Sequence, residues 1–200
     1  MTRNRKNILI VRNDRFGEFL LNIPAIRAVK ETFEESKVIL AVDPYVKELA
    51  ANVQYADEVI IWKNGKHSLF ETIKFSDLLK KKNIDIALVM NPSKDSNIAV
   101  FLAGIPERIG YDHKWSFLLT KRKEDLKHLG QKHEVEYNLD LVKLAGVASV
   151  IARRREASIA SPVIARLTKS AEAISKTGSQ QAPQSLKTRL LRTHYRSASQ

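Results

Sequence analysis

Short apolar runs alternate with amphipathic stretches along the first three quarters of the chain. The runs are four to six residues long, and polar residues with Pro or Gly separate each run from the next segment. A continuous apolar run of this length is typical of a strand that is buried on both faces. We therefore expect five strands, at 8–11, 38–42, 58–62, 85–90 and 108–111.

Helical spacing of apolar residues fills the segments between these strands. Five apolar residues after the first turn predict one amphipathic helix, namely Leu20, Leu21, Ile23, Ile26 and Val29. Further helices are expected at 45–52, after a capping box of Ser68 and Glu71, at 97–103 and at 133–145. The segments 91–96 and 118–130 have no clear period, so we expect a loop and an irregular charged stretch there.

Strands and helices that alternate at this spacing form βαβ units, whose strands are parallel. We therefore predict an α/β fold for residues 1–147, a Rossmann-like domain with helices on both faces of a parallel sheet. The composition changes after this domain. Residues 148–200 are rich in Ala, Ser and Arg, and we expect a basic tail that is partly helical or disordered.

The tail carries most of the basic excess of the chain, whose formal net charge is +12. Residues 148–200 hold 10 of the 34 Lys and Arg residues but only 2 of the 22 Asp and Glu residues. A tail of this kind either binds nucleic acid or anionic lipid, or has no fold and no specific partner. Tyr195 is its only aromatic residue, and bases stack on aromatic side chains. We favour the second interpretation and expect no specific nucleic-acid partner.

Composition also excludes several classes of protein. The chain has no Cys, so it forms no disulfides and no thiolate metal site. It contains no apolar run long enough for a transmembrane helix, and its first run is too short for a signal peptide. Gly-rich dinucleotide, Walker A, zinc-protease and serine-hydrolase motifs are absent. We expect a cytoplasmic protein without a bound metal.

A charged turn follows the first strand, where Arg12, Asp14, Arg15, Gly17 and Glu18 occur together. Ligands of open α/β sheets bind beyond the carboxyl ends of the strands, so this turn is the first candidate site. Asp14 is either a ligand contact or a helix N-cap, and Glu18 either compensates the helix dipole or acts as a general base. The two arginines bind phosphate or pair with these acids, and Gly17 allows close approach of a substrate or backbone.

A second polar group follows the fourth strand, at Asn91, Ser93 and Lys94. Neighbouring carboxyl ends of a parallel sheet converge on one cleft, so Lys94 either faces the first turn or is a solvated loop residue. His133, at the start of the last expected helix, is either a ligand contact or a cap.

Several segments in this order resemble glycosyltransferase family 9, the ADP-heptose:lipopolysaccharide heptosyltransferases. They are ILIVRNDRFGE at 8–18, PAIRA at 24–28, ADEVI at 56–60, and the stretches 86–112 and 133–147. The resemblance implies the N-terminal, acceptor-binding half of a GT-B glycosyltransferase. It also implies that Glu18 is the catalytic base, where the family usually has Asp, and that Lys94 lies near the phosphates of the acceptor or donor.

By this resemblance the function is inverting transfer of a heptose from ADP-heptose to a lipopolysaccharide-core acceptor, without a metal or other cofactor. Arg12, Arg15 and Lys94 would hold acceptor phosphates, at the inner face of the inner membrane. A family member has a second Rossmann-like domain, which the 53 residues after Val147 are too few to form. We therefore expect a truncated chain with doubtful activity alone. The alternative is a non-catalytic α/β module that binds a phosphorylated ligand or a partner chain.

Overall fold

A six-stranded sheet in the order β3-β2-β1-β4-β5-β6 organises the protein. The computed structural model describes residues 5–147. The chain divides into two units, Met1–Ala152 and Arg153–Gln200. The second unit, and with it the tail expected at 148–200, lies outside the described residues.

All six strands are parallel to their neighbours. Their bounds are β1 (Asn7–Val11), β2 (Lys37–Val42), β3 (Glu58–Ile61), β4 (Ile86–Val89), β5 (Glu107–Asp112) and β6 (Lys121–Glu124). The five expected strands and the parallel sheet are thus confirmed. The order changes direction between β1 and β4, because β2 and β3 lie to one side of β1 and β4 to β6 lie to the other.

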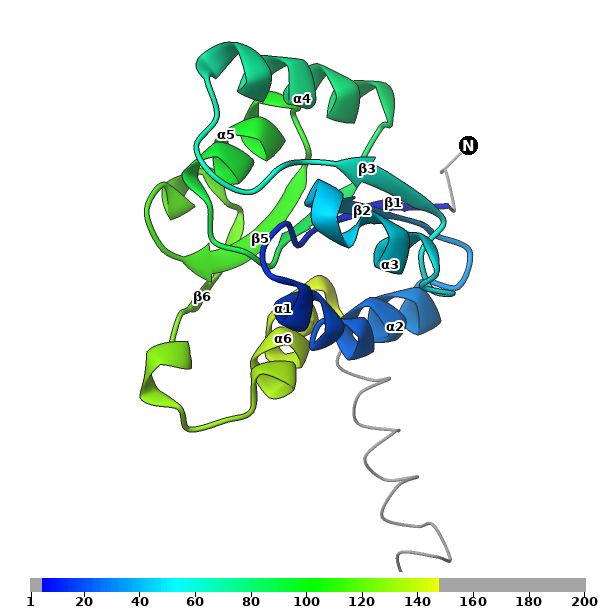
Figure 1. Ribbon diagram of the computed structural model, residues 1–200, viewed down its shortest axis with the longest axis vertical. Coiled ribbons are helices and arrows are strands. Elements are labelled where there is room, and N and C mark those ends of the chain that lie inside the picture. The colour runs from blue at the N-terminus through cyan, green and yellow to red at the C-terminus, as the bar shows by residue number, and fades with distance from the viewer. Residues whose placement is uncertain (1–4, 148–200) are drawn as a thin grey trace, which may run out of the picture. The chain divides into compact units, whose positions relative to one another are not determined.

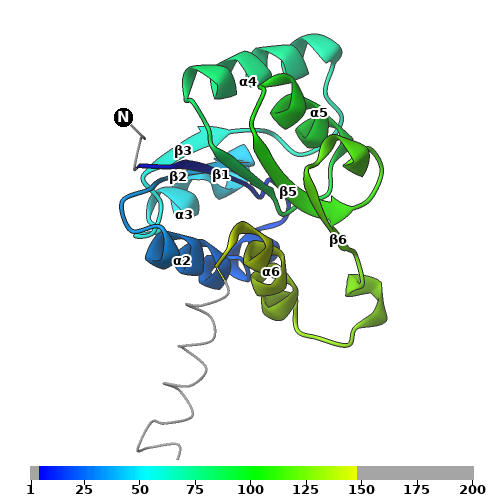
Figure 2. The same cartoon turned by 180° about the vertical axis from the view of Figure 1, so that it is seen from behind.

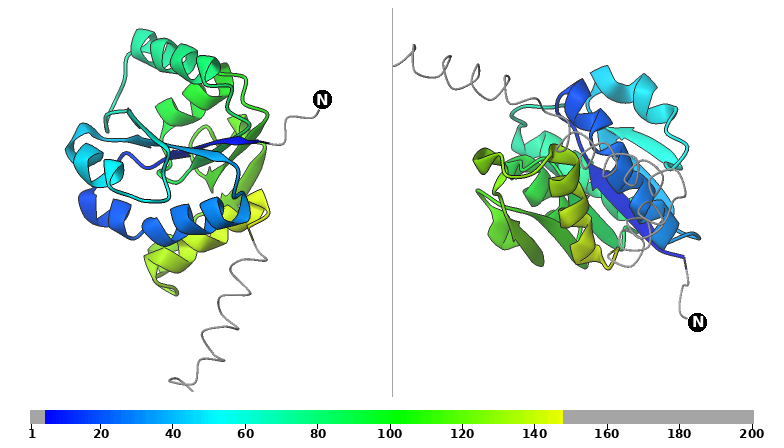
Figure 3. Two further views of the ribbon diagram at one scale, coloured as in Figure 1. Left: turned by 90° about the vertical axis from the view of Figure 1, so that its right-hand side faces the viewer. Right: turned by 90° about the horizontal axis from the view of Figure 1, so that it is seen from below.

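Two helix layers cover the sheet, as Figures 1 and 2 show. The helices are α1 (Phe16–Leu20), α2 (Ile23–Thr32), α3 (Lys47–Ala51), α4 (Leu69–Lys81), α5 (Lys94–Leu102) and α6 (Glu134–Val142). With the sheet seen nearly edge-on, α4 and α5 lie above it and α1, α2 and α6 below it (Figure 3). The expected helices on both faces are confirmed.

The alternation of side chains along β1 explains why both layers are needed. Ile8 and Ile10 belong to the core that contains residues of α2, α3 and α6. Leu9 and Val11 belong to the core that contains residues of α4 and α5. Successive side chains of a strand point to opposite faces of the sheet, so a strand without polar residues must be covered on both sides.

The prediction of a single helix after the first turn is wrong, because the structure has two helices there, α1 and α2. Pro24 lies in the first turn of α2, and the buried Asn22 is the N-cap. Proline lacks a backbone N–H and its ring clashes with the carbonyl of residue i−4. The helix therefore stops at Leu20 and restarts where proline is tolerated.

The N-terminus of α5 also differs from the expectation, which placed a loop over 91–96. Ser93 is the N-cap of α5, and its hydroxyl accepts a hydrogen bond from the backbone N–H of Ser96 at 3.5 Å. Lys94 is thus the first helical residue. The expected capping box of Ser68 and Glu71 at the start of α4 is confirmed.

Strand β6 was not expected, since 118–130 was predicted to be irregular. Its residues are KRKE, and none of them is buried. The strand lies at the edge of the sheet and pairs with β5 from Ile109–Lys121 to Asp112–Glu124. Charged side chains are common on edge strands, and such a strand has no apolar pattern to reveal it.

Candidate functional site

Three strand ends are tied together where the strand order changes direction. The side-chain amide of Asn91, after β4, donates a hydrogen bond to Oδ1 of Asn13, after β1, at 3.1 Å. Asn13 in turn donates to the carbonyl oxygen of Lys63, after β3, at 3.1 Å. Because ligands of open α/β sheets bind at this switch point, the residues around it form the candidate site.

Arg12 is the centre of the site and is only 2% exposed. Its Nε lies 2.9 Å from Oδ1 of Asp14, and its Nη2 lies 2.6 Å from Oε2 of Glu18 and 3.7 Å from Oε1 of Glu134. Its Nη1 donates to the carbonyl oxygen of Met90 at 3.1 Å. The guanidinium therefore lies among three carboxylates and is hydrogen-bonded to that of Glu18. Of the two roles left open for it, the structure gives pairing with acids, and a buried guanidinium is not presented to an acceptor phosphate.

Glu18 combines a fixed position with access to solvent. It lies in the first turn of α1, and its side chain is 36% exposed although Oε2 is held by Arg12. A general base must come within hydrogen-bond distance of the proton that it removes. One side of the Glu18 carboxylate faces the buried arginine, and part of the side chain is open to solvent.

Asp14 has a different environment. Its side chain is only 18% exposed. Burial raises the pKa of this carboxyl above its usual value, while the charge of Arg12 acts in the opposite direction. Asp14 is not an N-cap, because Arg15 occupies that position of α1 and no side chain caps the helix. The capping interpretation of Asp14 is therefore wrong.

Two further charged residues belong to the cluster, Glu134 and Lys127, and the sequence did not single them out. Oε1 of Glu134, the first residue of α6, lies 2.6 Å from Nζ of Lys127. That ammonium also lies 4.4 Å from the ring centre of Tyr111. In the sequence only the neighbouring candidate His133 pointed to Glu134. The charged segment before it has no apolar period, so its position in the fold could not be predicted.

The exposed part of the first turn contains Arg15 and Gly17. Within residues 5–147 the structure records no ion pair of Arg15. A Cβ added to Gly17 would meet nothing within 4 Å. No neighbouring segment of the protein therefore approaches Gly17 closely enough to require a glycine. The space beside Gly17 is open.

The remaining expected site residues have local partners. Ser93 caps α5, and Nζ of Lys94 lies 5.3 Å from the ring centre of Trp115. His133 is exposed and is the N-cap of α6, where Nδ1 accepts a hydrogen bond from the N–H of Val135 at 3.3 Å. The structure thus joins Arg12 to the two acids of its turn. It records no contact between these acids and Lys94 or His133 in the described part of the chain.

Among residues 5–147 there is no group of three or more His, Cys, Asp or Glu residues that could hold a metal ion. The acids that do gather here share the guanidinium of Arg12.

Several solved structures resemble this chain. The fold, a parallel sheet between two helix layers, matches part of several solved glycosyltransferases. E. coli ADP-heptose lipopolysaccharide heptosyltransferase II matches 68% of this chain at a TM-score of 0.59 and 21% identity. A glycosyltransferase of family 9 from Veillonella parvula matches 71% at a TM-score of 0.60 and 16% identity. E. coli heptosyltransferase WaaC with ADP matches 68% at a TM-score of 0.55 and 20% identity.

A sequence relative agrees with this fold. A Haemophilus influenzae protein described as a "Putative glycosyltransferase" is 27% identical over 139 residues, which are 69% of this chain. No protein-family model matches the chain. The expected resemblance to heptosyltransferases and other glycosyltransferases is confirmed. The chain spans 40% of the length of the H. influenzae relative, and 39% and 41% of the first two solved structures.

Proposed function

We propose that this chain forms the acceptor-binding side of an inverting glycosyltransferase of the heptosyltransferase type. The observation that carries the proposal is the half-exposed carboxylate of Glu18, which the buried Arg12 holds at the carboxyl edge of the sheet. The likeness in fold to heptosyltransferases supports the same reaction class.

In this proposal Glu18 removes the proton from a hydroxyl group of the acceptor sugar. The freed oxygen attacks the anomeric carbon of the heptose, the bond from that carbon to the diphosphate breaks, and ADP leaves with inversion. Arg12 is a positioning residue, because its hydrogen bond fixes the carboxylate on the side away from the substrate. A correctly placed base is worth about 10²- to 10⁴-fold in rate.

In this proposal Arg15 and Lys94 bind the phosphates, and the buried Arg12 does not. Arg15 is exposed in the turn after β1, and Lys94 is at the start of α5, after β4. Neither has an ion pair with a carboxylate among the described residues. Two unpaired cations at the edge of the sheet suit the phosphates of a lipopolysaccharide core or a developing diphosphate charge.

The donor that we propose is ADP-heptose, and the reaction needs no cofactor. Solved neighbours of this fold include WaaC with ADP and WaaC with ADP-2-deoxy-2-fluoro heptose, which supports a nucleotide-sugar. Within the described residues no helix is both long and apolar enough to span a bilayer. A lipopolysaccharide-core acceptor is consistent with peripheral contact at the inner face of the inner membrane, where we place the protein.

The test is a transfer assay with ADP-heptose and a core acceptor that lacks the heptose. We expect Glu18→Gln to lower the rate by about 10²-fold or more, because the amide cannot take the proton. Glu48→Gln, at an exposed acid of α3, is the matched control and keeps the wild-type rate.

Two results would count against the proposal. Equal rates for Glu18→Gln and wild type would remove the base assignment. Calorimetry that detects no binding of the core acceptor to this chain would remove the acceptor-binding role.

A further inference from the structure

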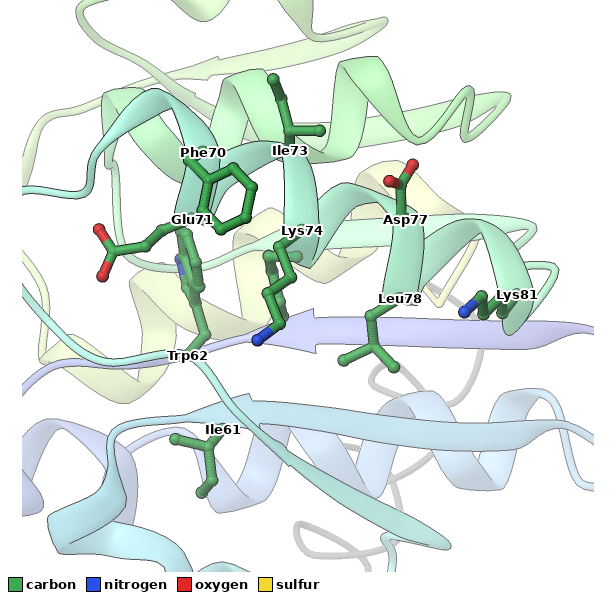
Figure 4. Close-up of a pocket in the computed structure, with 10 residues that line it drawn as sticks. Ile61, Trp62, Phe70, Glu71, Ile73, Lys74, Asp77, Leu78 and Lys81 are labelled. Carbon is green, nitrogen blue, oxygen red and sulfur yellow. The ribbon is translucent and has the colours of Figure 1, made fainter.

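A groove lies beside the outermost strand β3, between this strand and α4 (Figure 4). Its volume is about 660 Å³, within the range of ligand pockets, which are mostly apolar with a few polar groups. The side chains that line it include Ile61, Trp62, Phe70, Leu78, Lys74 and Lys81.

Several apolar side chains of the groove lie outside the core. The buried side of α4 is formed chiefly by Phe75, which also lines the groove, and Leu79. Phe70 is 75% exposed, and Leu78 and Ile61 are also exposed. Neighbouring apolar side chains left open to water in this way mark a binding surface.

The inner end of the groove is rigid, because Trp62 is fixed on several sides. Its ring stacks on Phe75 at 4.1 Å and on His67 at 3.7 Å between ring centres. Its Nε1 donates a hydrogen bond to the hydroxyl of Ser96 at 3.0 Å. A site whose wall is already ordered loses less entropy when a ligand binds.

Two acids and two lysines line the groove, and the acids have partners within the protein. The carboxylate of Glu71 accepts hydrogen bonds from the backbone N–H and hydroxyl of Ser68, and Asp77 pairs with Lys80 at 3.2 Å. Lys74 and Lys81, in contrast, have no ion pair with a carboxylate in the part of the chain that the structure describes. Lys74 and Lys81 are therefore the groups of the groove that an anionic ligand would contact.

The side chains place charge and apolar surface next to each other. In Figure 4, Lys74 and Leu78 extend from α4 toward the sheet, whereas Ile73 and Asp77 point away from it. A wholly apolar partner would cover the two lysines without compensating their charge, which is costly. A ligand with one apolar chain and one negative group matches both features.

We propose that this groove binds one molecule of an anionic monoacyl lipid. The acyl chain lies against Phe70, Leu78 and Ile61, and the negative group lies between Lys74 and Lys81. The concave shape suits a single chain better than the flat surface of a bilayer. The proposal does not depend on sugar transfer, because the ligand needs no sugar.

The test is calorimetric titration of the full 200-residue chain with lysophosphatidylglycerol below its micelle concentration. We expect saturable binding of one lipid per chain. Lysophosphatidylcholine of the same chain length, which has no net charge, should bind about tenfold more weakly, and glycerol phosphate should not bind at the same concentrations.

Two double variants distinguish binding in the groove from nonspecific attraction of the anionic lipid to a basic protein. Lys74→Gln/Lys81→Gln should weaken lysophosphatidylglycerol binding about tenfold. Lys47→Gln/Lys114→Gln removes the same charge at exposed positions outside the groove and should leave binding unchanged. All four side chains lie on the surface, and far-ultraviolet circular dichroism verifies the fold.

Three results would overturn the proposal. The two double variants could lose affinity equally, which would mean nonspecific charge attraction. Binding could appear only above the micelle concentration, which would favour a membrane surface. A lipid-free dimer that Lys74→Gln/Lys81→Gln dissociates would mean that a second copy of the chain fills the groove.

Discussion

Arg12 shows how one residue organises the carboxyl edge of the sheet. Its guanidinium is buried among Asp14, Glu18 and Glu134, and it also binds the carbonyl oxygen of Met90. Removing one member of such a buried group leaves the others with uncompensated charge, which typically costs about 3–5 kcal/mol. The position of Glu18 therefore depends on Arg12.

We expect Arg12→Met to lower the free energy of unfolding by about 3 kcal/mol, because the carboxylates of Asp14 and Glu18 would then lie together without their cation. Urea unfolding followed by circular dichroism measures this change. Arg15→Met, at an exposed arginine of the same turn, should change it by less than about 0.5 kcal/mol. Equal effects of the two substitutions would contradict the role given to Arg12.

The residue types of this cluster could be predicted from the sequence, but their pairing could not. Charges directly after a buried strand pointed to Arg12, Asp14 and Glu18. Whether Arg12 binds phosphate or pairs with acids depends on how deeply it is buried. It also depends on Glu134, which lies near the C-terminal end of the described residues. The charged segment before Glu134 has no apolar period, so the sequence did not predict that Glu134 would lie beside Arg12.

At the scale of elements, α6 is fixed by charge as well as by apolar packing. Asp140 lies between Lys132 and Lys143, at 2.7 and 2.6 Å. Burial raises its pKa, but the hydrogen bonds from the two lysines outweigh burial and lower the pKa of Asp140 to about 2. A carboxylate whose pKa is lowered in the folded state stabilises the fold at pH values above its usual pKa of 3.8. This contribution disappears as the pH falls toward 2.

We expect Asp140→Asn to lower the free energy of unfolding by about 1 kcal/mol near neutral pH. The full pKa shift corresponds to more, but the two lysines are partly exposed and solvent screens them. Urea unfolding should show the difference from wild type shrinking below about pH 4 and vanishing near pH 2. A difference that is the same at all pH values would mean that packing, and not charge, is lost.

The elements of the fold were predictable where burial imposes a period. The five apolar strands and the alternation with helices follow from it. The break before Pro24 was missed because the apolar pattern continues across it, although proline itself was the available signal. Strand β6 was missed because backbone pairing with β5 holds it, and its charged side chains carry no pattern.

At the scale of the whole molecule, the sheet brings separate turns to one edge. The turn after β1 supplies Glu18, and the hydrogen bond between Asn13 and Asn91 ties it to the turn after β4. The sequence predicted that these turns meet, because carboxyl ends of parallel strands share an edge. It did not predict the groove beside β3, which depends on how α4 lies over the sheet.

We propose that this edge of the sheet binds the sugar acceptor, and nuclear magnetic resonance locates the residues that the acceptor contacts. Isotope-labelled chain would be titrated with a lipopolysaccharide-core acceptor that lacks the heptose. We expect the largest amide shift changes in residues 12–18 and 91–96, and weaker binding in Arg15→Gln/Lys94→Gln. Shift changes confined to other parts of the described chain, with those two segments unmoved, would contradict the claim.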